Sequence, residues 1–140
     1  MEIIANALQT VQANQNVYFS DTVVSGGTAI SHRDDSGLIT LRGNTGQCRA
    51  RFRVTFGGNI AVPATGGTVG PISLAIAIEG EGVAASTMTV TPAAVSEFFN
   101  VHSSIFVDVP RGCCMSISVK NISTVPVDVQ NANLIVERVA

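Results

Sequence analysis

A nine-residue stretch of strictly alternating character, Cys48–Phe56, constrains the fold more than any other segment. Its sequence is C-R-A-R-F-R-V-T-F, which places cysteine, alanine, valine and phenylalanine on one face and arginine and threonine on the other. A period of two is that of a β-strand, because successive side chains point to opposite faces. Arg49, Arg51 and Arg53 therefore form one row, and they are three of the eight basic residues in the chain.

The composition favours an all-β protein of one domain that buries surface in an oligomer. Of the 140 residues, 46% are hydrophobic and only 13% are charged. This length fits one domain, which we expect to span residues 1–140. A chain with so few charges is poorly soluble as a monomer, so assembly is expected. The net charge of −2 gives no electrostatic basis for nucleic-acid binding, which is not expected.

Short alternating segments separated by turn residues continue along the rest of the chain. The expected strands are Ile3–Leu8, Val17–Phe19, Ala29–His32, Leu38–Leu41, Cys48–Phe56, Ile72–Ile78, Ser86–Thr91, Ser104–Val109, Met115–Lys120, Val125–Gln130 and Leu134–Val139. Gly57–Asn59 is expected to end the arginine strand, and Pro92–Glu97 is the only window with helical character. The pattern predicts a two-sheet jelly-roll sandwich of about eight to ten antiparallel strands, with the N- and C-terminal strands adjacent in one sheet.

Apolar side chains on a second strand face predict a subunit interface. The strand Leu134–Val139 is apolar on both faces, with Ile135 and Val139 on the face opposite to Leu134. Phe106 is likewise apolar on the otherwise polar face of its strand. A strand that is apolar on both faces is buried on both faces. The core can use only one of them, so Phe106, Ile135 and Val139 are expected to face a neighbouring subunit.

The arginine row is expected to lie at the same subunit boundary, with Asp108 and Glu137 on the matching faces of their strands. Buried arginines need partners, because an unpaired charge is costly to desolvate. The planar guanidinium bonds a carboxylate with two donors. We therefore predict ion pairs that join Arg51 or Arg53 to Asp108 and Glu137 and fix the register of the assembly. A solvated row and a site for an anionic ligand are the alternatives.

The three cysteines, Cys48, Cys113 and Cys114, are odd in number and contain no C-x-x-C motif. Zinc binding is therefore not expected. Buried or half-buried thiols are expected instead, with Cys48 facing the core of the sandwich. A disulfide to Cys48, or one between subunits, is the alternative.

No motif for catalysis, metal or cofactor binding is present. The only histidines are His32 and His102, and there is no G-x-S-x-G elbow. The run His32–Asp35 could suggest a metal or sugar site, but solvated turn residues are the simpler interpretation. The chain is therefore expected to be neither an enzyme nor a carrier of a cofactor or metal.

The order of these features resembles the trimeric jelly-roll superfamily of tumour necrosis factor and the complement-type globular heads. It is most similar to the heads of bacterial collagen-like spore and surface proteins. The matching stretches are Ala5–Phe19, Gly46–Phe56, Leu74–Gly80, Val109–Asn121 and Leu134–Val139. The resemblance implies a homotrimer. The chain has no Gly-X-Y tract, so a collagen-like stalk is absent or belongs to another polypeptide, and its three arginines exceed the usual charge of related heads.

Three function classes follow. The first is a homotrimeric structural head on a spore, virion or cell surface. The second is a module that recognises a glycan or surface protein at the trimer tip, and the third is a filament subunit cross-linked through Cys113 and Cys114. Met1–Ile4 lacks a basic signal-peptide region, and no apolar run is long enough for a membrane span. An extracellular or particle-surface location without conventional secretion is expected, and a cytoplasmic one is the alternative.

Overall fold

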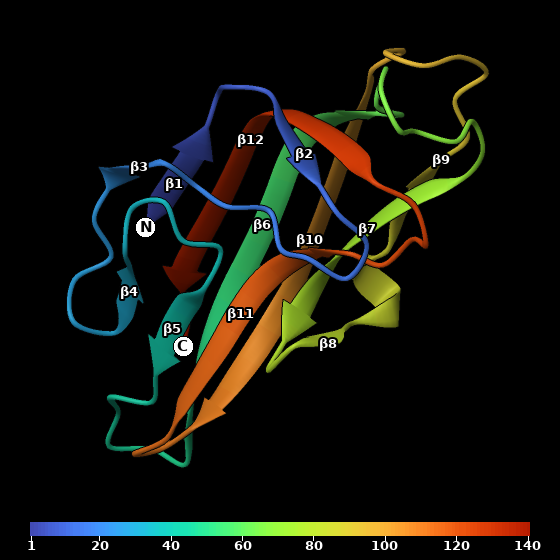
Figure 1. Cartoon of the computed structure of the whole chain (residues 1–140). Coiled ribbons are helices and arrows are strands. Elements are labelled where there is room, and N and C mark those ends of the chain that lie inside the picture. The colour runs from blue at the N-terminus through green and yellow to red at the C-terminus, as the bar shows by residue number, and fades with distance from the viewer.

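The computed structural model describes residues 1–140, which form two facing antiparallel sheets of six strands each (Figure 1). The first sheet contains β1 (Glu2–Ala5), β2 (Gln9–Val11), β3 (Asp21–Val24), β6 (Arg49–Ala61), β10 (Phe99–Pro110) and β12 (Val127–Arg138). The second sheet contains β4 (Ile30–His32), β5 (Ile39–Arg42), β7 (Ile72–Ile78), β8 (Glu81–Gly82), β9 (Met88–Val90) and β11 (Cys114–Asn121).

The strand order is that of a jelly roll, as predicted. The first sheet runs β10-β6-β12-β1-β3, with β2 beside β12, and the second runs β4-β5-β11-β7-β8, with β9 beside β7. The first and last strands are neighbours, because β1 pairs antiparallel with β12 and Ile3 lies opposite Leu134. There are more strands than the expected eight to ten because several edge strands are only two to four residues long.

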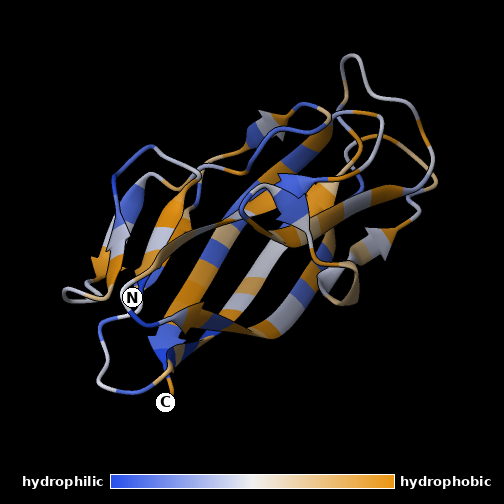
Figure 2. Cartoon of the chain, turned by 90° about the horizontal axis from the view of Figure 1, so that it is seen from below, coloured by the Kyte–Doolittle hydropathy of each residue, from blue (hydrophilic) through white to orange (hydrophobic).

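The core lies between the sheets and comes from the period-two alternation. In β6, Ala50, Phe52, Val54 and Phe56 are fully buried, and they belong to a cluster of 28 buried apolar residues drawn from both sheets. Figure 2 shows the result as alternating hydrophobic and hydrophilic bands along the long strands. Full burial of one such apolar side chain contributes roughly 1.5–3 kcal/mol, so β6 is a main source of stability.

The arginine strand does not end at Gly57–Asn59, contrary to the prediction. β6 continues to Ala61, and Gly58 is buried opposite Val101. A Cβ on Gly58 would lie 3.2 Å from the Phe56 ring and 3.5 Å from the Ala132 Cα. Gly58 therefore allows β6 to pass closely beside the bulge in β12, where the register shifts between Gln130 and Asn133.

Three further segments differ from the predicted strands. Val17–Phe19 contributes only isolated bridges at its ends, while the exposed strand β3 follows at Asp21–Val24. The expected strand from Ser86 begins as a three-residue 3-10 turn, Ala84–Ser86. The strands expected at Val125–Gln130 and Leu134–Val139 are one strand, β12, which has a bulge at Asn131, where φ is 55°.

The Ser86 hydroxyl explains why its segment is not extended. It accepts a hydrogen bond from the Ile76 amide at 2.9 Å and lies 2.7 Å from the Val83 carbonyl oxygen. This buried side chain takes the place of a backbone ladder partner beside β7. Pro92–Glu97 forms turns instead of a helix. The chain contains no helix that could span a membrane.

Asn121, at the end of β11, is a fully buried polar residue that ties three segments together. Its amide nitrogen donates to the carbonyl oxygens of Val11 at 3.0 Å and Val125 at 2.9 Å. Its side-chain oxygen accepts the backbone N–H of Ser123 at 3.0 Å. The nitrogen and the oxygen of this amide therefore both help to hold together β2, the end of β11 and the segment before β12.

We expect Asn121→Ala to lower the free energy of unfolding by about 2–4 kcal/mol, because it leaves buried carbonyl groups without donors. Urea unfolding at a fixed protein concentration measures this change. The matched control is Asn100→Ala, since Asn100 makes one exposed hydrogen bond with Asn59 at 3.1 Å. The control should change stability by less than about 0.5 kcal/mol. Equal effects of the two substitutions would contradict the role given to Asn121.

Candidate functional site

The outer face of the first sheet, turned away from the core, carries the arginine row. Because β6 lies between β10 and β12, its outward residues meet side chains from both neighbours. Asp108 lies opposite Arg51 on β10, and Glu137 lies opposite Arg53 on β12. The sheet register therefore decides which carboxylate each arginine meets.

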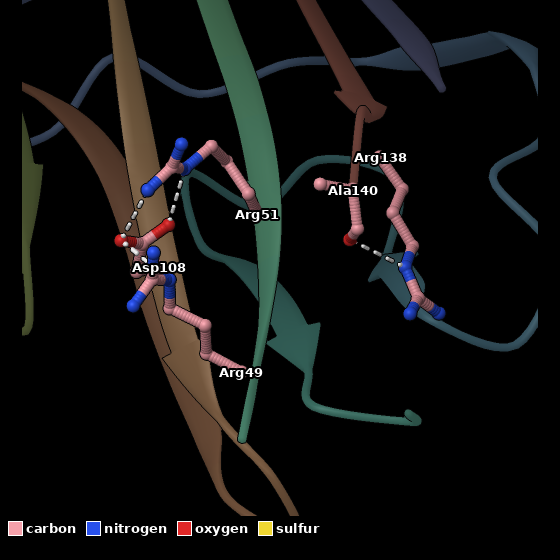
Figure 3. Close-up of polar contacts among 5 residues, drawn as sticks. All are labelled: Arg49, Arg51, Asp108, Arg138 and Ala140. Carbon is pink, nitrogen blue, oxygen red and sulfur yellow. Dashed lines mark hydrogen bonds and ion pairs between the residues drawn. The ribbon is translucent and has the colours of Figure 1, made fainter. Parts of the chain in front are cut away.

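The Asp108 carboxylate forms ion pairs with two arginines, Arg49 and Arg51 (Figure 3). Arg51 binds it with two donors, from Nε at 2.8 Å and from Nη2 at 3.1 Å. Arg49 approaches the same carboxylate through Nε at 3.2 Å. Hydrogen bonding from Arg51, aided by the charges of both arginines, holds the pKa of Asp108 below its usual range. The same hydrogen bonds raise the pKa of Arg51.

Arg53 forms a separate group with Glu137 and Phe106. Its Nε lies 2.9 Å from a Glu137 carboxylate oxygen, and its guanidinium carbon lies 6.0 Å from the centre of the Phe106 ring. The prediction joins Arg51 or Arg53 to Asp108 and Glu137 without assigning individual partners; within one chain, Arg51 pairs with Asp108 and Arg53 pairs with Glu137. These side chains are between 39% and 51% exposed in the single chain, so their burial between subunits stays a prediction.

The apolar residues predicted for the interface lie on this outer face or beside it. Phe106 is 62% exposed, and Ile135 and Val139 are each 40% exposed. Phe106 and Ile135 stand on β10 and β12, on either side of β6, whereas Val139 lies just beyond the end of β12. Val139 stays beside β6, because its N–H donates to the Arg51 carbonyl oxygen at 2.8 Å.

A cavity of about 320 Å³ lies at the Arg49 end of the row. It is lined by Gln47, Cys48, Arg49, Arg51 and Ala140. The Arg51 amide donates to the Ala140 carbonyl oxygen at 3.1 Å, which holds the segment after β12 against β6. We call this space the arginine cavity.

Two further arginines, which the sequence pattern did not single out, lie next to the arginine cavity. Arg138 donates from Nε to the Ala140 carbonyl oxygen at 3.2 Å and from Nη1 to the Asn44 carbonyl oxygen at 2.7 Å. The backbone N–H of Arg111 donates to the Cys48 carbonyl oxygen at 2.9 Å. These residues come from β12 and from the turn after β10, so only the tertiary fold brings them to the start of β6.

All three cysteines are exposed, which corrects the expectation of buried or half-buried thiols. Cys48 lies in the bend just before β6, so it does not continue the core-facing set that begins at Ala50. Cys113 lies between the Pro110–Gly112 turn and β11, and Cys114 begins β11. Backbone hydrogen bonds bring the two loops together, from Arg111 to Cys48 and from Gly43 to Cys113. The thiols therefore gather at one end of the sandwich, where the teal and orange loops meet in Figure 1.

His32 lies beside a second cavity, of about 350 Å³, near β4 and β5. Its Nε2 lies 2.8 Å from the Ser36 carbonyl oxygen, and its Nδ1 lies 3.2 Å from the Thr22 hydroxyl. Both ring nitrogens are therefore engaged by neighbouring groups, and His32 is the partly exposed last residue of β4, whereas Arg33–Asp35 are exposed as expected for a solvated turn. His102 is exposed on β10, opposite Gly57, and no cluster of three metal-binding side chains is present in residues 1–140.

The lowered pKa of Asp108 predicts how its ion pair depends on pH. A carboxyl group whose folded pKa lies below its unfolded value, about 3.9 for Asp, stabilises the fold above that value. The contribution is lost as the pH falls through the lower folded pKa. We therefore expect Asp108→Asn to lower Tm at neutral pH, and the difference from wild type to shrink below about pH 4.

Thermal unfolding of both proteins across this pH range measures the effect. Asp35→Asn is the control, because Asp35 is an exposed turn residue outside the ion pairs, with φ of 65°, which Asn also tolerates. Parallel curves for wild type and Asp108→Asn at every pH would contradict the role of the ion pair.

No protein-family profile matches the chain, and no curated protein matches its sequence. Solved structures do match. The globular domain of the zebrafish complement 1qA protein aligns with a TM-score of 0.62 at 11% identity, over 96% of this chain and 93% of that chain.

Two other matches have lower TM-scores. The C-terminal domain of EclA, a sugar-binding protein, has a TM-score of 0.43 at 13% identity, over 95% of this chain and 79% of that chain. The family 35 carbohydrate-binding module of Cellvibrio japonicus Abf62 has a TM-score of 0.42 at 9% identity, over 100% and 98%. The chain thus has the jelly-roll fold of the complement-type globular domain.

Proposed function

We propose that this chain is a non-enzymatic structural protein that assembles as a homotrimeric globular head on a spore, virion or cell surface. The observation that carries the proposal is the exposure of three large apolar side chains on the outer side of the first sheet, Phe106, Ile135 and Val139, which we call the apolar group. Phe106 and Ile135 stand on the regular, paired strands β10 and β12, on either side of β6. An exposed apolar group in such a rigid setting, on a chain with few charges, favours a partner surface.

The charges around this apolar group suit a buried boundary. Arg53 is paired with Glu137 and lies near the Phe106 ring. An ion pair that is already formed within one chain is less costly to cover than an isolated charge. The proposed interface is centred on Phe106, Ile135, Val139, Arg53 and Glu137, and Arg49, Arg51 and Asp108 lie at its margin.

A ring of three subunits needs two different patches on each chain, because its contacts are heterologous. The apolar group around Phe106 would supply the first patch. The opposite edge of the same sheet is β3, where Val23 and Val24 are 51% and 53% exposed. An edge strand with exposed valines is a natural second patch, because unpaired edges otherwise invite uncontrolled pairing. The fold likeness to a complement globular domain supports the resemblance from which the trimer is inferred.

Size-exclusion chromatography with light scattering tests the assembly directly. We expect a mass of three times the chain mass of 14.5 kDa. Phe106→Asp should reduce this to one chain mass or cause aggregation, because it places a charge in an interface expected to bury more than about 2,000 Å². A native trimer in the Phe106→Asp variant would show that the interface is wrongly placed.

Leu38→Asp is the matched control for Phe106→Asp. Leu38 is also a large exposed apolar residue, at 52%, but it lies in the loop before β5 of the second sheet. We expect this variant to keep the trimer mass. A monomer for both variants would point to a general effect of the added charge.

The exposed thiols favour one alternative, a filament subunit cross-linked through Cys48, Cys113 or Cys114. The trimer proposal predicts that a reducing agent leaves the mass by light scattering unchanged, because the apolar contacts hold the subunits together. Reduction that releases single chains would favour the cross-linked filament instead. Comparison of the same sample with and without reducing agent separates the two.

A further inference from the structure

Positive charge is concentrated at one end of a chain whose net charge is −2. Arg49 and Arg51 line the arginine cavity, and Arg111 and Arg138 are bonded to residues that line it. The carboxylate paired with this group is that of Asp108. Four guanidiniums gather around one side-chain carboxylate, so positive charge predominates in a region that holds half of the basic residues. Such an excess attracts an anion.

The two lining arginines keep free donors. Arg51 uses Nε and Nη2 on Asp108, which leaves Nη1 without a protein partner. Arg49 contacts Asp108 only through Nε, and neither of its Nη groups makes a hydrogen bond within the chain. Asp108 also holds Arg51 in a fixed orientation, so part of the ordering cost of binding is already met. Beside the Asp108 carboxylate, the guanidiniums of Arg49 and Arg51 thus keep N–H groups that can bond a further oxyanion.

Arg138, the third arginine drawn in Figure 3, interacts differently from Arg49 and Arg51. Arg138 points away from the Asp108 group, and its guanidinium is occupied by the carbonyl oxygens of Asn44 and Ala140. Arg138 therefore adds to the positive field without lining the cavity. Arg111 is held in the same way, since its Nη1 donates to the Gly46 carbonyl oxygen at 3.3 Å.

The size and lining of the cavity select the class of ligand. Its volume of about 320 Å³ is at the lower end of the range for small-molecule sites, which suits one compact group. Gln47 supplies an amide that can both donate to and accept from hydroxyl groups. No aromatic side chain lines the cavity, so it offers no stacking platform for a nucleic-acid base.

We propose that the arginine cavity binds an acidic saccharide, with the sugar carboxylate on the free donors of Arg49 and Arg51 and a hydroxyl on Gln47. The cavity is formed by one chain, so binding does not require the proposed trimer. It lies at the end of the arginine row, at the margin of the proposed interface. A head with this site would recognise a carboxylated glycan.

An NMR titration of backbone amide signals tests the site and its location. The probes are glucuronate, neutral glucose as the matched control without a carboxylate, and inorganic phosphate. We expect glucuronate to shift signals from residues 47–51 and 138–140, glucose to shift none, and added salt to weaken the binding. Shifts centred on the second cavity around His32, or equal shifts with glucose, would overturn the proposal. Binding of phosphate without glucuronate would show a simple anion site and overturn the assignment to a saccharide.

Two substitutions with the same change of charge complete the test. Arg49→Gln should weaken glucuronate binding by about tenfold, because it removes two free charged donors. Arg33→Gln is the control, since Arg33 is exposed and lies away from the arginine cavity, in the turn after β4. Equal weakening by both would mean that only net charge matters, and would overturn the proposal.

Light scattering on the same samples keeps this test separate from that of the trimer. Binding by a protein that is monomeric would leave the saccharide site standing and refute the assembly. A wild-type trimer that binds none of the probes would refute the saccharide site and leave the proposed assembly standing.

Discussion

The two faces of β6 are the constraint on which the rest of the structure depends. One face fills the centre of the core, and the other carries the arginine row between β10 and β12. A shift of one residue in its pairing would turn Phe52 and Phe56 outward and bury Arg51 and Arg53 in the core. The cost of burying unpaired guanidiniums makes that alternative inaccessible. The same alternation therefore excludes register shifts by one residue in the first sheet and fixes the face on which each charge of β6 lies.

The sequence was most informative where one face of a strand is apolar and the other polar. The alternation in β6, β7 and β11, and the placement of the last strand beside the first, could be predicted for this reason. The position of Asp108 and Glu137 on the same face as the arginine row could also be predicted, because strand faces follow from parity, whereas the sheet register decides which carboxylate each arginine meets. The odd or even position of a residue determines which face of the strand its side chain occupies, wherever the strand begins or ends.

Strand ends and loops were less predictable, because tertiary contacts decide them. The glycines after Phe56 have the composition of a turn, but β6 continues through them, and Gly58 packs closely against the Phe56 ring and the bulge in β12. Cys48 has the right parity for the core, yet the strand starts one residue later and leaves the thiol exposed. The positions of Arg111 and Arg138 beside the cavity depend on how a turn and the segment after β12 fold back onto β6. No local pattern carries that information.

The charge along the arginine row changes in a way that relates assembly to recognition. At Arg53 the charge is balanced by Glu137, and the guanidinium carbon lies 6.0 Å from the centre of the exposed Phe106 ring, so this part of the face presents an aromatic ring beside a neutral ion pair. At Arg49 and Arg51 one carboxylate serves two guanidiniums, and positive charge remains. Covering neutral apolar surface is favourable, whereas covering unpaired charge is not. A neighbouring subunit would therefore settle over the Phe106 end and stop short of the Arg49 end. The surplus charge would then remain open at the margin of the assembly, where an acidic ligand can reach it.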